Sequence, residues 1–157
     1  MAGTIARLRR KVFEPHANPW SAWSRWGTTP LVVVPVWTRK WTHAVPVLAW
    51  MIANAVVFPK PEHERARATR AVLGEEIWIV ERPRDAAMAV NAGSIACLVA
   101  ALIAARRRTL APAVAGTAGA MALIMVYWKQ MADYYDAEQA ARRQSRNVEH
   151  GTPDDGV

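Results

Sequence analysis

Side chains of the types that catalyse reactions or bind metals are few in this sequence and widely spaced. The histidines are His16, His43, His63 and His150. No two of them lie four residues apart, the spacing that places two metal ligands on one face of a helix. The single cysteine, Cys97, excludes a disulfide framework and a cysteine metal cluster within the chain. We therefore predict no metal and no cofactor; haem bound by His16 or His43 is the alternative.

Glu75 and Glu76 are adjacent carboxylates, and such a pair is able to do acid–base work or to bind a cation. More often a pair of this kind lies on a helix surface and neutralises nearby bases, which here are Arg65, Arg67 and Arg70. Both interpretations stay open, and the second is the more common one. In either case the two glutamates are candidate site residues.

The segment from His16 to Arg25 reads His-x-Asn-Pro-Trp-Ser-x-Trp-x-Arg and leads into an apolar run. Asparagine is a good N-cap and proline fits the first helical position, so a helix should start at Asn18-Pro19. Tryptophan at every third residue beside a hydrophobic run is typical of a membrane–water interface. We expect an aromatic anchor lying in the membrane plane, with Arg25 reaching lipid phosphates or a carboxylate of Glu75 or Glu76. The candidates in this segment are His16, Asn18, Pro19, Trp20, Trp23, Trp26 and Arg25.

Charged residues are absent from four stretches, and this pattern predicts an all-α membrane protein with four transmembrane helices. The expected spans are residues 26–38, 41–58, 86–105 and 109–128. The first is short and interrupted by Pro30 and Pro35, so it either turns back within the membrane or extends backwards through the tryptophans as a kinked span. Amphipathic interfacial helices are expected at residues 1–13 and at about 62–81, with Asp85 as the cap of the following helix. Residues 1–136 then form one membrane domain, and residues 137–157 a polar, disordered tail.

Asn54 and Asn91 are polar residues inside these uncharged stretches. Each is expected to make an interhelical hydrogen bond rather than to line a pathway, because no ionisable residue accompanies it at membrane depth. Proton-coupled transporters and pumps usually need such a residue.

Small residues recur every fourth position along the third and fourth predicted spans. Lipid provides no hydrophobic drive between helices, so close backbone approach along small residues is what holds them together. The three-arginine link at 106–108 is short enough to force these two spans into an antiparallel hairpin. We therefore expect their tightest contact along small residues of both helices. These are Ala89, Gly93, Cys97, Ala101 and Ala105 on one helix and Ala111, Ala115 and Gly119 on the other, with Gly116 and Ala120 alongside.

The distribution of basic residues predicts the orientation in the membrane. With four spans, the two short links contain only five of the 20 Lys and Arg residues, and the other 15 lie on the side of both termini. The positive-inside rule then places both termini in the cytoplasm, for a multi-pass protein of the cytoplasmic (inner) membrane. The net charge of +7 is better explained by anionic lipid headgroups than by nucleic acid, because most basic residues flank apolar runs.

Three segments resemble a family of small, uncharacterised prokaryotic integral membrane proteins, a domain of unknown function. They are residues 16–25, then Phe58-Pro59-x-Pro61-Glu62, then Thr69-Arg70-x-Val72-Leu73-Gly74-Glu75. The resemblance covers roughly Phe13 to Trp128 and departs at Lys60, where the family more often continues in prolines. It implies a short multi-helix membrane protein and brings no established activity with it.

These observations favour a non-enzymatic membrane module, an accessory or structural subunit that packs against lipid or a partner membrane protein. The alternative is a small transporter or pore that acts as an oligomer. A membrane enzyme acting on lipid through His16, Glu75 or Glu76 is the third reading. The expected partners are anionic lipids and either another membrane protein or a second copy of this chain.

Overall fold

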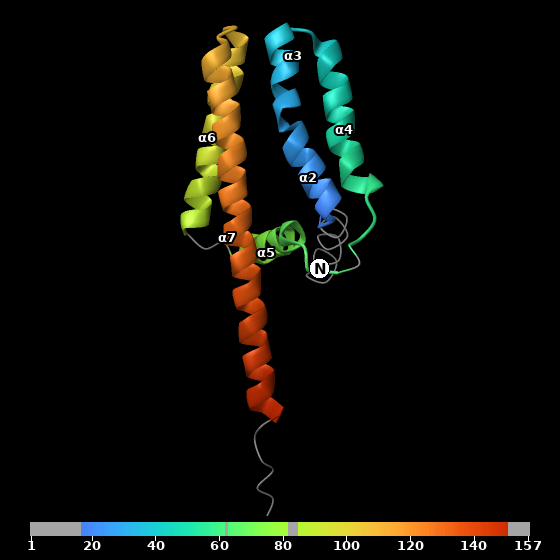
Figure 1. The fold of residues 1–157 in the computed structure, drawn as a ribbon, viewed down its shortest axis with the longest axis vertical. Helices are drawn as coiled ribbons and strands as arrows, with labels where there is room; N and C mark the ends of the chain where they lie inside the picture. The colour runs from blue at the N-terminus through green and yellow to red at the C-terminus, as the bar shows by residue number, and fades with distance from the viewer. Residues whose placement is uncertain (1–16, 62, 82–84, 151–157) are drawn as a thin grey trace, which may run out of the picture.

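A computed structural model describes residues 17–61, 63–81 and 85–150, and these residues are helical with no strand (Figure 1). His16 and the basic segment at residues 1–13 lie outside the described residues. The elements, in chain order, are α2 (Pro19–Thr28), the 3-10 turn η1 (Thr29–Val32), α3 (Val33–Thr38), the 3-10 turn η2 (Trp41–His43), α4 (Ala44–Val57), α5 (Arg67–Glu81), α6 (Ala86–Arg106) and α7 (Leu110–His150).

Two helical hairpins stand side by side, and α5 crosses α7 below them (Figure 1). One hairpin pairs α2, η1 and α3 with α4, and the other pairs α6 with α7. The tips of both hairpins lie at the same end, where Arg39 Nη2 donates to the carbonyl oxygen of Arg106 at 3.0 Å. α7 packs most extensively against α6 and α5, so it is the element on which the others are assembled.

The first hairpin begins where the sequence predicts. Asn18 caps α2 by accepting from the amide of Trp20, and Pro19 takes the first helical position. α2 is not a separate helix set at a sharp angle to the apolar run, because it continues roughly in line with η1 and α3 (Figure 1). Pro30 has no N–H for the carbonyl of Trp26, and the amide of Thr29 bonds to that carbonyl instead. The chain therefore tightens into a 3-10 turn and goes on, which is the kinked extension through the tryptophans.

Among the described residues, two helices are long and apolar enough to cross a membrane, and both belong to the second hairpin: α6 and α7, the latter through its N-terminal part. Asp85 caps α6 as predicted, accepting from the amide of Met88 at 3.1 Å. The prediction of four transmembrane helices is supported only for these two. α3 and α4 are too short for that test, since η1 separates α3 from α2 and α4 ends at Val57.

α7 continues to His150, so residues 137–150 are helical where we expected disorder. This stretch lacks glycine and proline until Gly151 and is rich in alanine, glutamine and arginine, which are good helix formers. Arg142 Nε also pairs with Glu138 Oε1 at 2.8 Å, one helical turn away. The polar composition led us to expect disorder, but the helix propensity of these residues and the Arg142–Glu138 pair stabilise a helix there.

The contact between α6 and α7 includes only part of the predicted set of small residues, among them Ala120 and Gly116. Ala89, Ala111 and Ala115 are exposed, whereas Ala101 and Ala105 are fully buried as expected. On α6, Ala87, Ser94 and Ala101 recur seven residues apart, and on α7 Ala113, Thr117, Ala120 and Tyr127 follow steps of four, three and seven. Further buried residues are Ala104 and Ala105 on α6 and Met131, Ala132 and Tyr135 on α7. A seam of period 3.5 is what two antiparallel helices crossing at a small angle bury, and a strict four-residue step drifts off it.

The closest approach of α6 and α7 is at Gly116 rather than at Gly93 or Gly119. A Cβ on Gly116 would lie 2.9 Å from the carbonyl oxygen of Cys97 and 3.0 Å from Ala101. The corresponding nearest distances are 3.4 Å at Gly93 and 3.5 Å at Gly119, both to side chains and both ordinary contacts. Glycine at position 116 is therefore needed for the backbones to approach.

We expect Gly116→Ala to lower the free energy of unfolding by about 1–3 kcal/mol, since the added methyl group pushes against backbone atoms. Gly119→Ala is the matched control on the same helix, and its methyl group fits in the space present. Thermal unfolding of both variants in the same detergent measures the difference. Equal midpoints would show that the approach at Gly116 is not limiting.

Candidate functional site

The three segments that carry the family resemblance meet below the hairpins, and Asn18 joins the first to the second. Its Oδ1 caps α2, and its Nδ2 donates to the carbonyl oxygen of Pro59 at 2.9 Å. Pro59 follows the end of α4, where carbonyl groups have no intrahelical partner. One buried amide therefore fixes the start of α2 and the end of α4 together.

The third segment joins the same place through Thr69. Its hydroxyl donates to the carbonyl oxygen of Ala17 at 2.7 Å, and both residues are buried. This bond holds the first turn of α5 against the residue that precedes the cap of α2. α5 begins at Arg67, later than the predicted start near residue 62, and Glu62 itself lies outside the described residues.

A buried polar network links α2 to α4 through Asn54. Ser21 Oγ donates to Asn54 Oδ1 at 2.8 Å, and Asn54 Nδ2 donates to Ser24 Oγ at 2.8 Å. Ser24 Oγ in turn donates to the carbonyl oxygen of Ser21. Asn54 and Ser21 are fully buried, and their side-chain donors and acceptors satisfy one another. Asn54 thus makes interhelical hydrogen bonds of the predicted kind, which join the two helices of the first hairpin.

We expect Asn54→Leu to lower the free energy of unfolding by about 2 kcal/mol, because Ser21 and Ser24 lose buried hydrogen-bond partners. Asn91→Leu is the control: Asn91 lies in α6, is partly exposed, and contributes only its backbone carbonyl to a hydrogen bond with Ser94. That substitution should shift stability by less than about 0.5 kcal/mol. Chemical unfolding followed by circular dichroism compares them. Equal losses would mean that the network contributes nothing specific.

Two charged side chains, Arg25 and Glu75, lie where α2, α5 and α7 meet, together with the hydroxyl of Tyr127. Tyr127 donates to Glu75 Oε1 at 3.1 Å, and Arg25 Nε donates to the carbonyl oxygen of Ser21 at 3.3 Å. Burial raises the pKa of Glu75, against the opposing effects of the Tyr127 hydrogen bond and the Arg25 charge. The Arg25 charge thus opposes part of the effect of burial on Glu75, and a direct Arg25–Glu75 pairing stays a prediction.

The tryptophans of α2 divide between the surface and the neighbouring helix. Trp20 is 74% exposed. Trp23 packs edge-on against Trp26 and against Trp128 of α7, with ring centroids 5.7 and 5.6 Å apart. Trp26 donates its indole N–H to the carbonyl oxygen of Met121 at 3.2 Å. Two of the three rings therefore attach α2 to α7.

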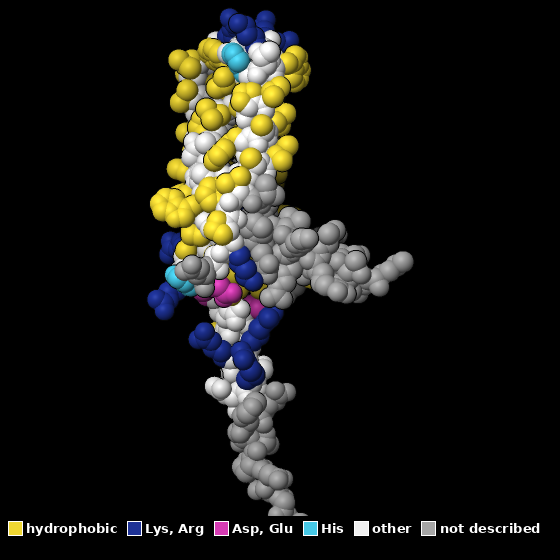
Figure 2. Space-filling model, turned by 90° about the vertical axis from the view of Figure 1, so that its right-hand side faces the viewer, with side chains coloured by type: hydrophobic (Ala, Val, Ile, Leu, Met, Phe, Trp, Pro, Cys, Tyr) yellow, Lys and Arg dark blue, Asp and Glu magenta, His cyan; other side chains and the backbone are white. Residues whose placement is uncertain are grey.

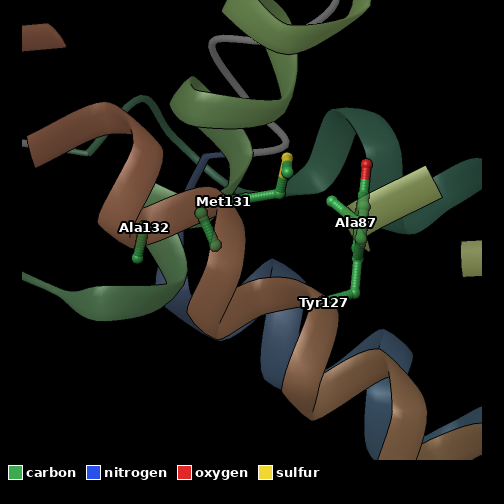
Figure 3. Packing of buried hydrophobic residues seen from close by; sticks show 5 residues of the cluster. Ala87, Tyr127, Met131 and Ala132 are labelled. Atoms are coloured by element: carbon green, nitrogen blue, oxygen red, sulfur yellow. The ribbon is translucent and has the colours of Figure 1, made fainter. Parts of the chain in front are cut away.

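α5 is attached to α7 through close packing and through polar groups at its start. The cluster of Ala71, Ala87, Tyr127, Met131 and Ala132 joins α5, α6 and α7, and Figure 3 shows this packing. Arg70 pairs with Asp136 at 2.6 Å, and the Tyr135 hydroxyl donates to Glu64. Burial, together with the hydrogen bond and charge of Glu64, raises the pKa of Tyr135 to about 12.

Within the described ranges, no group of three His, Cys, Asp or Glu side chains is able to hold a metal ion. His43 lies at the hairpin tips, where its Nδ1 is 2.8 Å from Thr38 Oγ1, and His63 is exposed. Neither histidine makes a described contact with Asn54, Arg25 or Glu75. Glu76 is partly buried beside Glu75. The contacts that the structure describes for Asn54 and Glu75 are hydrogen bonds between helices.

A sequence model described as "Family of unknown function (DUF6653)" matches residues 1–153. The chain belongs to the DUF6653 family. No curated protein and no solved structure matches it. The match is longer than the expected Phe13 to Trp128, so both the N-terminal segment and most of the α7 extension belong to what defines DUF6653.

Several residues of this DUF6653 junction were not identified from the sequence. Ser21 and Ser24 lie within the first segment, and the step of three residues between them was a signal that they share a helix face. Gly74 was quoted in the third segment, but its role depends on α7 passing directly over it. Nothing in the sequence around Tyr127 indicated that its hydroxyl reaches Glu75.

Proposed function

We propose that this chain is a non-enzymatic integral membrane module that anchors a cytoplasmic helical platform for a partner protein. The observation that carries the proposal is the exposure of large apolar side chains on both hairpins. Figure 2 shows one face of this apolar zone, between basic residues at the tips and a charged zone near α5. An apolar surface of this extent is stable in lipid and prone to association in water. Examples on the four helices are Leu31, Val34, Leu48, Ile52, Ile95, Val99, Ile103 and Val114.

Four crossings are proposed, rather than the two that length and composition support. The path from Pro19 to Thr38 is about 30 Å long at helical rise, close to the thickness of the hydrocarbon core. Both hairpin tips lie at one end and share the Arg39–Arg106 hydrogen bond, so a membrane that holds one hairpin surrounds the other. With both termini cytoplasmic, the side richer in Lys and Arg faces the cytoplasm.

The platform consists of α5 and the part of α7 beyond Tyr135. This extension projects away from the rest of the chain (Figure 1), and its side chains from Ala140 to Val148 are exposed. A long helix that exposes its side chains in this way in the described part of the chain is suited to contact another protein. Next to the hairpin bodies, a groove of about 470 Å³ between α3 and α7 is lined by Val33, Trp37, Val114 and other largely apolar side chains. Such a lining favours a lipid chain or a partner helix over a polar transported solute.

Topology mapping tests the membrane part of the proposal. On a Cys97→Ser background, single cysteines at positions 40, 107 and 144 would be labelled with a membrane-impermeant maleimide. We expect 40 and 107 to react from the same face and 144 from the other. Reaction of 40 and 107 from opposite faces would reject four crossings, and release of the chain by alkaline carbonate would reject membrane integration altogether.

A further inference from the structure

Each hairpin turns on an arginine in the left-handed backbone conformation. Arg39 has φ of 56° and Arg108 has φ of 57°. At Arg108 the turn is completed by two bonds, from its own amide to the carbonyl of Ala105 and from the amide of Thr109 to that of Ala104. Glycine adopts this conformation at least cost, so arginine is a disfavoured residue at both turns. A side-chain role at this end of the molecule would explain why arginine is present there.

The hairpin tips concentrate positive charge without compensation in their own sequences. Arg39, Lys40 and residues 106–108 lie there, and they form the dark blue cap in Figure 2. No Asp or Glu occurs between residues 15 and 61 or between residues 86 and 132. The nearest carboxylates along the chain are therefore at the opposite ends of the hairpins. Such a cap attracts anions.

A cavity of about 550 Å³ opens within this cap, between α3 and the end of α6. Two guanidinium groups, from Arg39 and Arg106, line it together with the apolar side chains of Pro35 and Val36 and the ring of Trp41. The bond from Arg39 Nη2 to the carbonyl oxygen of Arg106 fixes one guanidinium at the wall. Among the described residues, its other N–H groups have no acceptor.

We propose that this cavity binds the phosphate of an anionic phospholipid, with an acyl chain descending along Pro35 and Val36. The inference rests on the proposed insertion of the hairpins in a membrane. The 21 residues of α6 span about 32 Å, so Arg106 at its end lies at headgroup depth if α6 crosses. Trp41, which is 88% exposed, stands at the same level, where indole rings prefer to lie. Paired guanidinium groups are suited to phosphate, and the uncompensated cap selects against zwitterionic lipid.

Native mass spectrometry of the full chain, delipidated in mild detergent, tests the site. Phosphatidylglycerol and phosphatidylcholine are titrated separately, and we expect at least a tenfold preference for the anionic lipid. Arg39→Gln with Arg106→Gln should remove that preference. Lys40→Gln with Arg107→Gln removes the same charge from tip residues that do not line the cavity, and should change it less than threefold. Arg106→Gln alone keeps the Arg39 hydrogen bond, which uses only a backbone carbonyl, and should lose most of the preference without unfolding.

Equal losses in the two double variants would overturn the proposal, because they would indicate a diffuse charged surface. Displacement of phosphatidylglycerol by millimolar inorganic phosphate would overturn it in favour of a free-anion site. A chain that resists alkaline extraction but shows no lipid preference would reject this site and leave the membrane proposal standing. Extraction by carbonate would reject the membrane proposal first.

Discussion

Gly74→Ala should be among the most destabilising single-methyl substitutions in this chain. α5 crosses α7 so closely at Gly74 that an added Cβ would collide with the carbonyl oxygen of Met131 and lie 2.8 Å from its carbonyl carbon. The Cβ of Tyr135 would be 3.3 Å away. These are backbone or backbone-proximal atoms of a long helix and have little freedom to move aside. We expect a loss of about 3 kcal/mol or more in the free energy of unfolding, with α5 separating from α7.

Gly27→Ala is the matched control for that substitution. Gly27 is also helical, and a Cβ there would meet nothing within 4 Å. Alanine is the better helix former, so this variant should gain up to about 1 kcal/mol. Thermal unfolding in one detergent, with limited proteolysis near residues 63–66 to detect release of α5, compares the pair. Comparable stability of the two variants would contradict the close crossing.

The starts of α2 and α6 were predictable from the sequence, because their capping signals are local. An asparagine or aspartate followed by a helix-compatible first turn satisfies free amide groups with its own side chain, and this happens at Asn18 and Asp85. The antiparallel α6–α7 hairpin was similarly predictable, since a link as short as residues 106–108 leaves no other geometry.

What the sequence could not provide was the rotation and alignment of the helices. The small residues of α6 and α7 are so numerous that several stripes are possible, and only the crossing angle selects the one through Ala101 and Gly116. The tryptophan pattern predicted an interfacial helix, but the 3-10 turn at Pro30 lets α2 continue along α3. These outcomes depend on packing between distant segments.

In the candidate site, too, local features were predictable from the sequence and contacts between distant segments were not. The residues that form it were mostly singled out, including Asn18, Arg25, Asn54 and Glu75. Their partners were largely missed, because Pro59 is 41 residues from Asn18 and Tyr127 is 52 residues from Glu75. Hydrogen bonds across such distances follow from the tertiary arrangement, which no local pattern encodes.

Arg25 and Glu75 should make the free energy of unfolding depend on pH. The folded-state pKa of Glu75 lies above the ordinary value of 4.5, so the folded chain binds this proton more tightly than the unfolded chain does. Stability from this group is therefore full below pH 4.5 and is lost as the pH rises through the folded-state pKa. The positive charge of Arg25 limits that loss, because it favours the ionised carboxylate.

Arg25→Gln should consequently raise the pKa of Glu75 further, extend the pH-dependent decline to higher pH, and lower stability at neutral pH by about 2 kcal/mol. Glu75→Gln retains an oxygen that accepts from Tyr127 but has no charge to desolvate, so this part of the pH dependence should disappear. Combining the two substitutions should restore part of the stability lost in Arg25→Gln. The measurement is the unfolding free energy of all four proteins from pH 4 to pH 9. If Arg25→Gln follows the parent profile at every pH, or if the double variant is no more stable than Arg25→Gln at neutral pH, the two charges do not stabilise each other.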